Sequence, residues 1–144
     1  MEDFKKEIWE KDGYRLEYDS LNQLQIRQIL HRLTEICSIP IDNIDNPAIF
    51  TKMSDMLSKK LVLSTINETD GFKDICSLLK LNIPKNSTVY IIWNYNTIDK
   101  IKACVLQDYW DYIWYGTSDE MCLLYFPDIE SLIMITDYGT IQSN

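Results

Sequence analysis

The stretch STVYIIW, residues 87–93, is where the chain changes from helical periodicity to extended segments. Its β-branched and aromatic residues pack well on a pleated surface, so it predicts a central strand. NYNT, residues 94–97, has the composition of a turn. IDKIKACVLQ, residues 98–107, alternates lysines with apolar residues and therefore predicts a half-buried strand beside the first.

A second strand pair is predicted further along the chain. MCLLYF, residues 121–126, and SLIMIT, residues 131–136, are apolar runs with Pro127 and Asp128 between them. Turn residues between two such runs predict a hairpin with a four-residue loop. The last residues, DYGTIQSN (137–144), are interpreted as a short polar tail.

The residues before Pro84 have helical periodicity instead. Ser20 with Gln23 three residues later is a capping-box pattern, and it predicts the start of the clearest helix, which Pro40 bounds. The other predicted elements are a helix over 2–11 ended by Gly13, an edge strand over 14–18, a helix from Asn46 and Pro47, a strand or helix tail over 61–65, and a helix after Thr69 or Asp70.

This order of elements predicts an α+β fold in which N-terminal helices pack on one face of a C-terminal antiparallel sheet. A chain of 144 residues without a linker or internal repeat predicts a single globular domain over 1–144. Its helical part covers about 1–84, and its mainly sheet part covers about 85–144.

The charges are distributed unevenly along the chain. The net charge is −8, yet all fourteen lysines and arginines lie at or before Lys102. Residues 103–144 contain no base and seven acids: Asp108, Asp111, Asp119, Glu120, Asp128, Glu130 and Asp137. A field of one sign disfavours nucleic acid and anionic membranes, both of which need a basic surface. It favours a basic protein as the partner.

Catalytic and metal-binding signals are weak. The cysteines, Cys37, Cys76, Cys104 and Cys122, lie far apart in apolar segments, which predicts buried free thiols in a reducing cytoplasm. His31 is the only histidine, and we find no catalytic or phosphate-loop motif, so we expect no metal, no cofactor and no enzymatic activity. The N-terminal residues lack the apolar core of a signal peptide, which also favours the cytoplasm.

DYWDYIWYGTSDE, residues 108–120, is the most unusual segment, because it concentrates aromatic and acidic residues without a base. One interpretation is packing: Asp108 caps a helical turn, and Trp110 and Trp114, four residues apart, share a face against the core. The other is a binding surface, in which aromatic residues anchor a partner and carboxylates select basic groups. The candidate partner-binding residues are Asp108, Trp110, Asp111, Trp114, Tyr115, Asp119 and Glu120.

STVYIIWN, DYWDYIWYGTSDE and MCLLYFPDIESLIMITDYG resemble the strand, aromatic-acidic turn and final hairpin of small acidic bacterial immunity proteins. These belong to polymorphic toxin and contact-dependent inhibition systems, and the resemblance covers roughly residues 87–139. It implies a protein that binds and blocks a toxin domain. It carries over no individual functional residue, because it includes no defined motif.

We therefore expect a non-enzymatic binding protein, in the form of an immunity protein that occludes a basic toxin domain with an acidic aromatic surface. The alternatives are a structural or regulatory adaptor and a hydrolase that uses paired carboxylates. The oligomeric state and the exposure of the two tryptophans stay open at this point.

Overall fold

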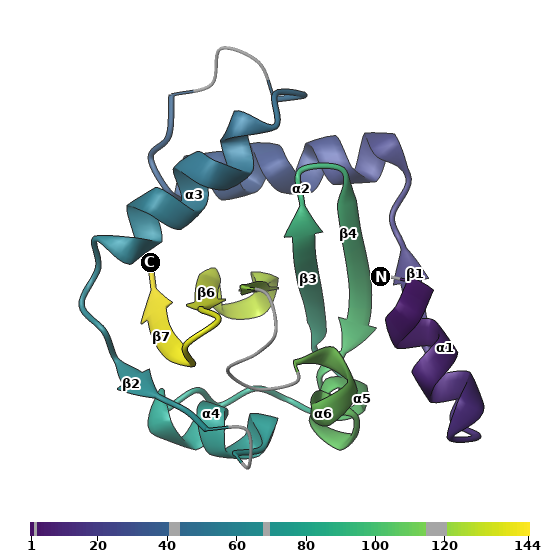
Figure 1. Ribbon diagram of the computed structural model, residues 1–144. Coiled ribbons are helices and arrows are strands. Elements are labelled where there is room, and N and C mark those ends of the chain that lie inside the picture. Colours follow the sequence, from purple (N-terminus) through teal and green to yellow (C-terminus); the bar gives the residue numbers. More distant parts are fainter. Residues whose placement is uncertain (2, 41–43, 68–69, 115–120) are drawn as a thin grey trace.

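Seven strands form one antiparallel sheet in the part of the chain that the structure describes. This computed structural model describes residues 1–144 apart from 2, 41–43, 68–69 and 115–120 (Figure 1). The strand order is β1-β4-β3-β5-β6-β7-β2. The strands are β1 (Tyr18–Ser20), β2 (Ser64–Thr65), β3 (Thr88–Asn94), β4 (Thr97–Lys102), β5 (Cys122–Phe126), β6 (Ser131–Ile135) and β7 (Thr140–Ser143).

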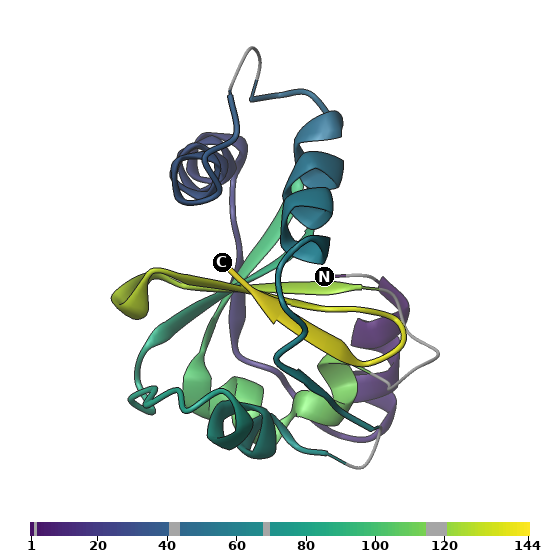
Figure 2. The same cartoon turned by 90° about the vertical axis from the view of Figure 1, so that its left-hand side faces the viewer.

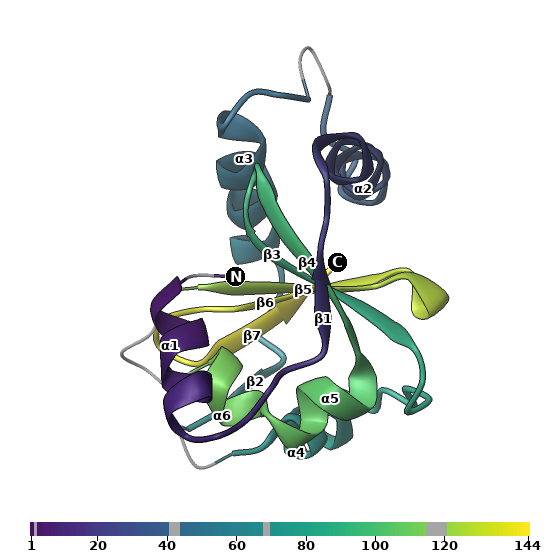
Figure 3. The ribbon, with the colours of Figure 1, turned by 90° about the vertical axis from the view of Figure 1, so that its right-hand side faces the viewer.

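Within the same described ranges, six α-helices cover the sheet from both sides. They are α1 (Asp3–Lys11), α2 (Gln23–Ile36), α3 (Ala48–Ser58), α4 (Phe72–Leu78), α5 (Ala103–Asp108) and α6 (Trp110–Ile113). Helices α2 and α3 lie on one face, and α1, α4, α5 and α6 lie on the other (Figures 2 and 3). The predicted α+β class, with N-terminal helices on an antiparallel sheet, is confirmed. The sequence left open what covers the second face of the sheet, and the structure places helices there as well.

Two core layers explain why both faces need helices. Successive side chains of a strand point to opposite faces, and Ile91 and Ile92 of β3 are both fully buried. Ile92 packs in one layer with Leu33 of α2 and Met53 of α3. Ile91 packs in the other layer with residues that include Trp9 of α1. A central strand that is apolar on both faces therefore requires a helical layer on each side.

The helix ends follow the predicted chemistry with small shifts. Helix α2 begins two residues later than predicted, because Asn22 and Gln25 form the reciprocal capping box instead of Ser20 and Gln23. Before α3, the side-chain oxygen of Asn46 accepts a hydrogen bond from the backbone N–H of Ala48. The β5–β6 hairpin has the predicted four-residue connection, formed by the 3-10 turn η1 (Pro127–Ile129) and Glu130.

Two segments of the sheet half differ from the prediction. The strand expected over 98–107 ends at Lys102, and α5 begins at Ala103. The polar tail forms β7, which pairs with β6 and with β2. The turn into β7 requires Gly139, because its φ is 73° and a Cβ there would clash with the backbone carbonyl of Ile66.

Candidate functional site

Trp110 and Trp114 lie in the core. Each is 2% exposed, and their rings stack with centroids 6.2 Å apart, as expected for residues on one face of a helical turn. The ring of Phe72 from α4 lies 5.5 Å from that of Trp110. The two indoles therefore offer no surface to a partner in this structure. Their burial supports the packing interpretation and does not support the prediction that they are contact residues.

The acids of this segment have separate positions. Asp108 and Asp111 are exposed, as a partner-binding role requires. Asp108 is the last residue of α5 and does not cap the next turn, since α6 has Tyr109 at its N-cap without a side-chain hydrogen bond. Tyr115, Asp119 and Glu120 lie outside the described residues.

Three tyrosines come together at the surface, and two of them, Tyr109 and Tyr112, directly follow Asp108 and Asp111 in the sequence. The ring centroid of Tyr14 lies 5.6 Å from that of Tyr109 and 5.7 Å from that of Tyr112, and the latter two lie 6.4 Å apart. Tyr14 is 46% exposed, and the other two are half-buried. The Tyr112 hydroxyl donates a hydrogen bond to Asp12 at 3.0 Å. We call these rings, with the carboxylates of Asp12, Asp108 and Asp111, the tyrosine–carboxylate surface.

The end of α1 positions Tyr14. Gly13 has a φ of 79°, which a glycine adopts without steric cost. The Gly13 N–H donates to the Glu10 carbonyl at 3.1 Å, and the Tyr14 N–H donates to the Trp9 carbonyl at 2.9 Å. This is the hydrogen-bond pattern of a Schellman motif, so the predicted role of Gly13 in ending α1 is confirmed.

Lys5 ties the middle of α1 to α6. Its side chain is buried, and the ammonium donates a 2.7 Å hydrogen bond to the carbonyl of Ile113, the last residue of α6. It also lies 4.7 Å from the ring centroid of Trp93. A buried ammonium loses its hydration, and the carbonyl and the indole face partly replace it.

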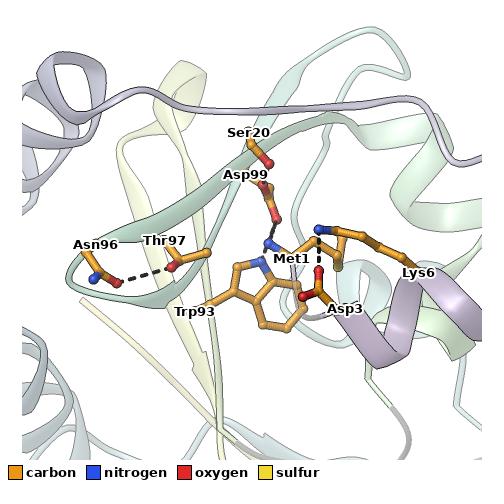
Figure 4. A network of polar contacts seen from close by, with 8 residues as sticks. All are labelled: Met1, Asp3, Lys6, Ser20, Trp93, Asn96, Thr97 and Asp99. Atoms are coloured by element: carbon orange, nitrogen blue, oxygen red, sulfur yellow. Dashed lines mark hydrogen bonds and ion pairs between the residues drawn. The ribbon is translucent and has the colours of Figure 1, made fainter.

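Asp99 ties the beginning of α1 to the sheet (Figure 4). Its carboxylate is fully buried in β4 and forms an ion pair with the amino group of Met1. It also accepts hydrogen bonds from Ser20 Oγ at 2.6 Å and from Trp93 Nε1 at 2.8 Å. With Lys5, these contacts hold α1 against both β4 and α6, so the backbone that carries Tyr14 has fixed neighbours on two sides.

The tyrosine–carboxylate surface is suited to contact cations rather than to perform chemistry. Phenol rings attract cations over their faces, and exposed carboxylates form ion pairs. Partial burial and the hydrogen bond donated to Asp12 raise the pKa of Tyr112, which keeps its hydroxyl protonated. Among the described residues, no three His, Cys, Asp or Glu side chains group as a metal site. His31 is exposed on α2, on the opposite face of the sheet from this surface, with Glu35 beside it.

Sequence reasoning missed Tyr14, Asp12, Lys5 and Asp99 as parts of this region. Lys5 had a usable signal, because it is four residues before Trp9 and therefore shares the buried stripe of α1. Asp99 had another, because it has the same parity in β4 as the buried Ile101. The meeting of Tyr14 with Tyr109 and Tyr112 had none, since it depends on how α1 packs against α6.

Comparisons of the chain with protein-family models, with curated proteins and with solved structures give no match. No helix within the described ranges has the length and apolar character needed to cross a bilayer. The function is therefore argued from the geometry and charge of the surface alone.

Proposed function

We propose that this is a non-enzymatic binding protein whose tyrosine–carboxylate surface holds a basic protein partner. The observation that carries the proposal is the contact of three partly exposed tyrosine rings, one of them bonded to Asp12, in a region whose α5 and α6 part carries the exposed Asp108 and Asp111 and no lysine or arginine. The more specific form of the proposal is an immunity protein that occludes the basic site of a toxin domain.

Tyrosines suit this role for a physical reason. A tyrosine side chain supplies a large rigid contact area, and few rotatable bonds are restricted when it binds. Here the neighbouring rings restrict each other further, so part of the ordering cost is met before the partner arrives. The hydroxyl of Tyr112 is already oriented by its bond to Asp12.

Carboxylates around such rings determine which partner is accepted. Opposite charge steers a basic protein toward the surface and raises association rates to about 10⁸ M⁻¹s⁻¹ at low salt. A toxin must be captured quickly in the cell that makes it, so fast association favours the immunity form. An acidic surface also matches the basic groove with which a nuclease toxin holds phosphate groups.

The test is capture from the native host with a matched pair of charge reversals. The variant carries Asp108→Lys and Asp111→Lys, and the control carries Asp55→Lys and Asp137→Lys. Asp55 is an exposed acid on α3, on the opposite face of the sheet from α6, and Asp137 is an exposed acid between β6 and β7. Neither belongs to the tyrosine–carboxylate surface. A basic protein should bind wild type and control, elute between about 50 and 500 mM salt, and be absent with the variant.

The identity of the captured protein separates the two forms of the proposal. A toxin domain that loses its activity when mixed with the purified chain supports the immunity form. A basic partner without toxicity supports the adaptor alternative. Equal capture by the variant and the control contradicts binding through this surface.

A further inference from the structure

The segment that leads from α3 into β2 carries an exposed apolar run. Leu61 is 81% exposed, Val62 is 48% exposed and Leu63 is 50% exposed. In the described part of the chain, no other three consecutive large apolar residues are all exposed. A strand that covers a core alternates buried and exposed side chains, so this run is not explained by the core of its own chain. Contiguous exposed apolar residues of this kind mark interaction sites.

The run lies on an open edge of the sheet, residues 59–67, which we call the β2 edge. β2 ends the strand order and has β7 as its one neighbour among the described strands. In Figures 1 and 2 the segment between α3 and β2 runs along the outside of the molecule, and no other element lies beyond it. The Leu63 N–H donates to the Ile141 carbonyl at 2.8 Å. Gln142 Nε2 donates to the carbonyls of Ser58 and Lys60, at 2.9 Å each, so the edge is held in place against β7.

The two ends of the β2 edge carry opposite charges. Lys59 and Lys60 are exposed, and neither forms an ion pair with another described residue. At the other end, the Ile66 N–H donates to a carbonyl of the β6–β7 turn, so the next N–H, that of Asn67, points away from β7. The carboxylate of Asp70 accepts this Asn67 N–H at 2.8 Å and therefore lies on the open side of the edge.

An edge with this order of charges is complementary to itself. A two-fold axis that relates two antiparallel strands places the beginning of each beside the end of the other. We propose that the β2 edge pairs with the β2 edge of a second copy, antiparallel and centred on Val62, so that the chain forms a weak two-fold dimer. In that register Leu61 of each copy lies opposite Leu63 of the other, and the apolar run covers itself. The proposal goes beyond the proposed function and does not depend on it.

The lysines of the edge do not prevent this pairing. Lysines on an edge strand oppose self-association when they meet each other. In the register centred on Val62, Lys60 lies opposite Ser64 of the other copy, and Lys59 lies opposite Thr65. Lys59 is also diagonal to the backbone position that holds the Asp70 carboxylate, at about 7–8 Å, which a long side chain spans. The dimer contains this contact twice, once at each end.

Other occupants fit the charges of the β2 edge less well. The basic partner of the proposed function would be repelled by Lys59 and Lys60. An acidic strand would meet the Asp70 carboxylate at the other end. A parallel pair of two copies would place lysines beside lysines. The antiparallel second copy is the arrangement in which opposite charges meet at both ends.

The size of the edge sets the expected strength of the dimer. Nine extended residues span about 30 Å, and the contact is about one strand wide. Such a contact lies at the low end of specific interfaces, so we expect half of the chains to be dimeric at roughly 0.05–0.5 mM. Sedimentation equilibrium from about 0.01 to 1 mM measures this association. A monomer over the whole range overturns the proposal.

A matched pair of leucine variants locates the interface. Leu61→Ser should weaken dimerisation about tenfold, because each dimer loses two leucine pairs. Leu61 is 81% exposed, so its removal should leave the Tm nearly unchanged. The control Leu24→Ser removes another leucine, 68% exposed on α2, and should leave dimerisation unchanged. Equal dimerisation of the two variants overturns the β2 edge as the interface.

Charge reversal tests the antiparallel arrangement. Lys59→Glu with Lys60→Glu in one variant, and Asp70→Lys in another, should each weaken dimerisation about tenfold, because like charges then meet at both ends. An equimolar mixture of the two variants should regain the wild-type association, since opposite charges meet at both ends of the mixed dimer. A mixture that associates no better than its components overturns the arrangement. Thermal unfolding checks that both variants fold, and the leucine pair decides the proposal if Asp70→Lys does not.

The dimer and the proposed function fail separately. Capture of the basic partner should survive Leu61→Ser, because Leu61 is not part of the tyrosine–carboxylate surface. A dimer without any captured basic partner leaves the β2 edge standing and contradicts the proposed function. Capture that is lost with Leu61→Ser, for a chain that stays monomeric alone, assigns the edge to the partner and overturns the dimer.

Discussion

Replacement of Trp110 by alanine should be among the most destabilising single changes in this chain. The indole is 2% exposed and packs against Phe72 and Trp114, with ring centroids at 5.5 and 6.2 Å. Burial of a tryptophan removes about 150–250 Å² from water, which at about 25 cal/mol per Å² corresponds to about 4–6 kcal/mol. This is an upper estimate, because the unfolded chain already buries part of that area.

Two further contributions modify this figure. The ring contacts with Phe72 and Trp114 add about 0.5–1.5 kcal/mol each. The Trp110 Nε1–H has no hydrogen-bond partner among the described residues, and a buried unpaired donor costs about 1–3 kcal/mol. The contributions offset each other, so we expect Trp110→Ala to lower the free energy of unfolding by about 3–5 kcal/mol.

Urea unfolding followed by circular dichroism measures this loss, and thermal unfolding should show a Tm lower by roughly 8–16 °C. Trp110→Phe tests the unpaired donor separately, since it removes the N–H and keeps an aromatic ring. It should cost less than about 1.5 kcal/mol. Asp111→Ala, one residue away and exposed, serves as the control and should stay within about 0.5 kcal/mol of wild type.

A loss below about 1 kcal/mol for Trp110→Ala would refute the reasoning. If that variant also lost its basic partner at an unchanged Tm, the tryptophan would belong to the interface. The binding site would then be centred on the indole of Trp110 rather than on the three tyrosines.

Three further outcomes follow from buried and partly buried groups. Asp99→Asn leaves the Met1 ammonium buried without its carboxylate, so urea unfolding should show a loss of about 3–5 kcal/mol, and a change below about 1 kcal/mol contradicts the ion pair. Burial raises the pKa of the Cys37 and Cys76 thiols to about 11, so at pH 8 only about one in a thousand is thiolate, and reaction with a disulfide reagent should be far slower in the native chain than in urea. The pKa of Tyr112 is raised in the folded protein, so its protonated hydroxyl contributes to stability below pH 10. This contribution is lost as the pH rises through the higher pKa of the folded state. Tyr112→Phe should remove one late component from the absorbance titration at 295 nm.

The fold class was predictable because several segments carry unambiguous local signals. The β5–β6 hairpin has two apolar runs around Pro127, and α2 has a capping box followed by regular apolar spacing. The α5 segment was not predictable, because a short apolar run such as ACVLQ fits a buried helix and a strand equally well. The β7 segment is too short and polar to signal a strand, and it is one because β6 and β2 provide backbone partners on both sides.

The candidate site, like the fold, was predictable where the signal lies within one segment and was not predictable where distant segments meet. The shared face of Trp110 and Trp114 follows from their four-residue spacing within one segment. The sequence did not decide which acids are exposed, and the structure shows that Asp108 and Asp111 are. Whether that shared face points inward depends on Phe72 of α4, which is distant in sequence. The contact of the tyrosines also depends on residues distant in sequence, because it requires α1 to pack against α6, where the buried Lys5 bonds to the carbonyl of Ile113.

This dependence on α1 connects the buried polar groups to the proposed binding surface. A surface that orders itself only on binding loses affinity to the entropy of ordering, about 0.5–1.5 kcal/mol for each flexible side chain. Here Asp99 and Lys5 fix α1 at two points, and the Schellman motif at Gly13 fixes the residue that follows it. On this argument, the buried charges of this protein act on affinity through rigidity, although neither reaches the partner.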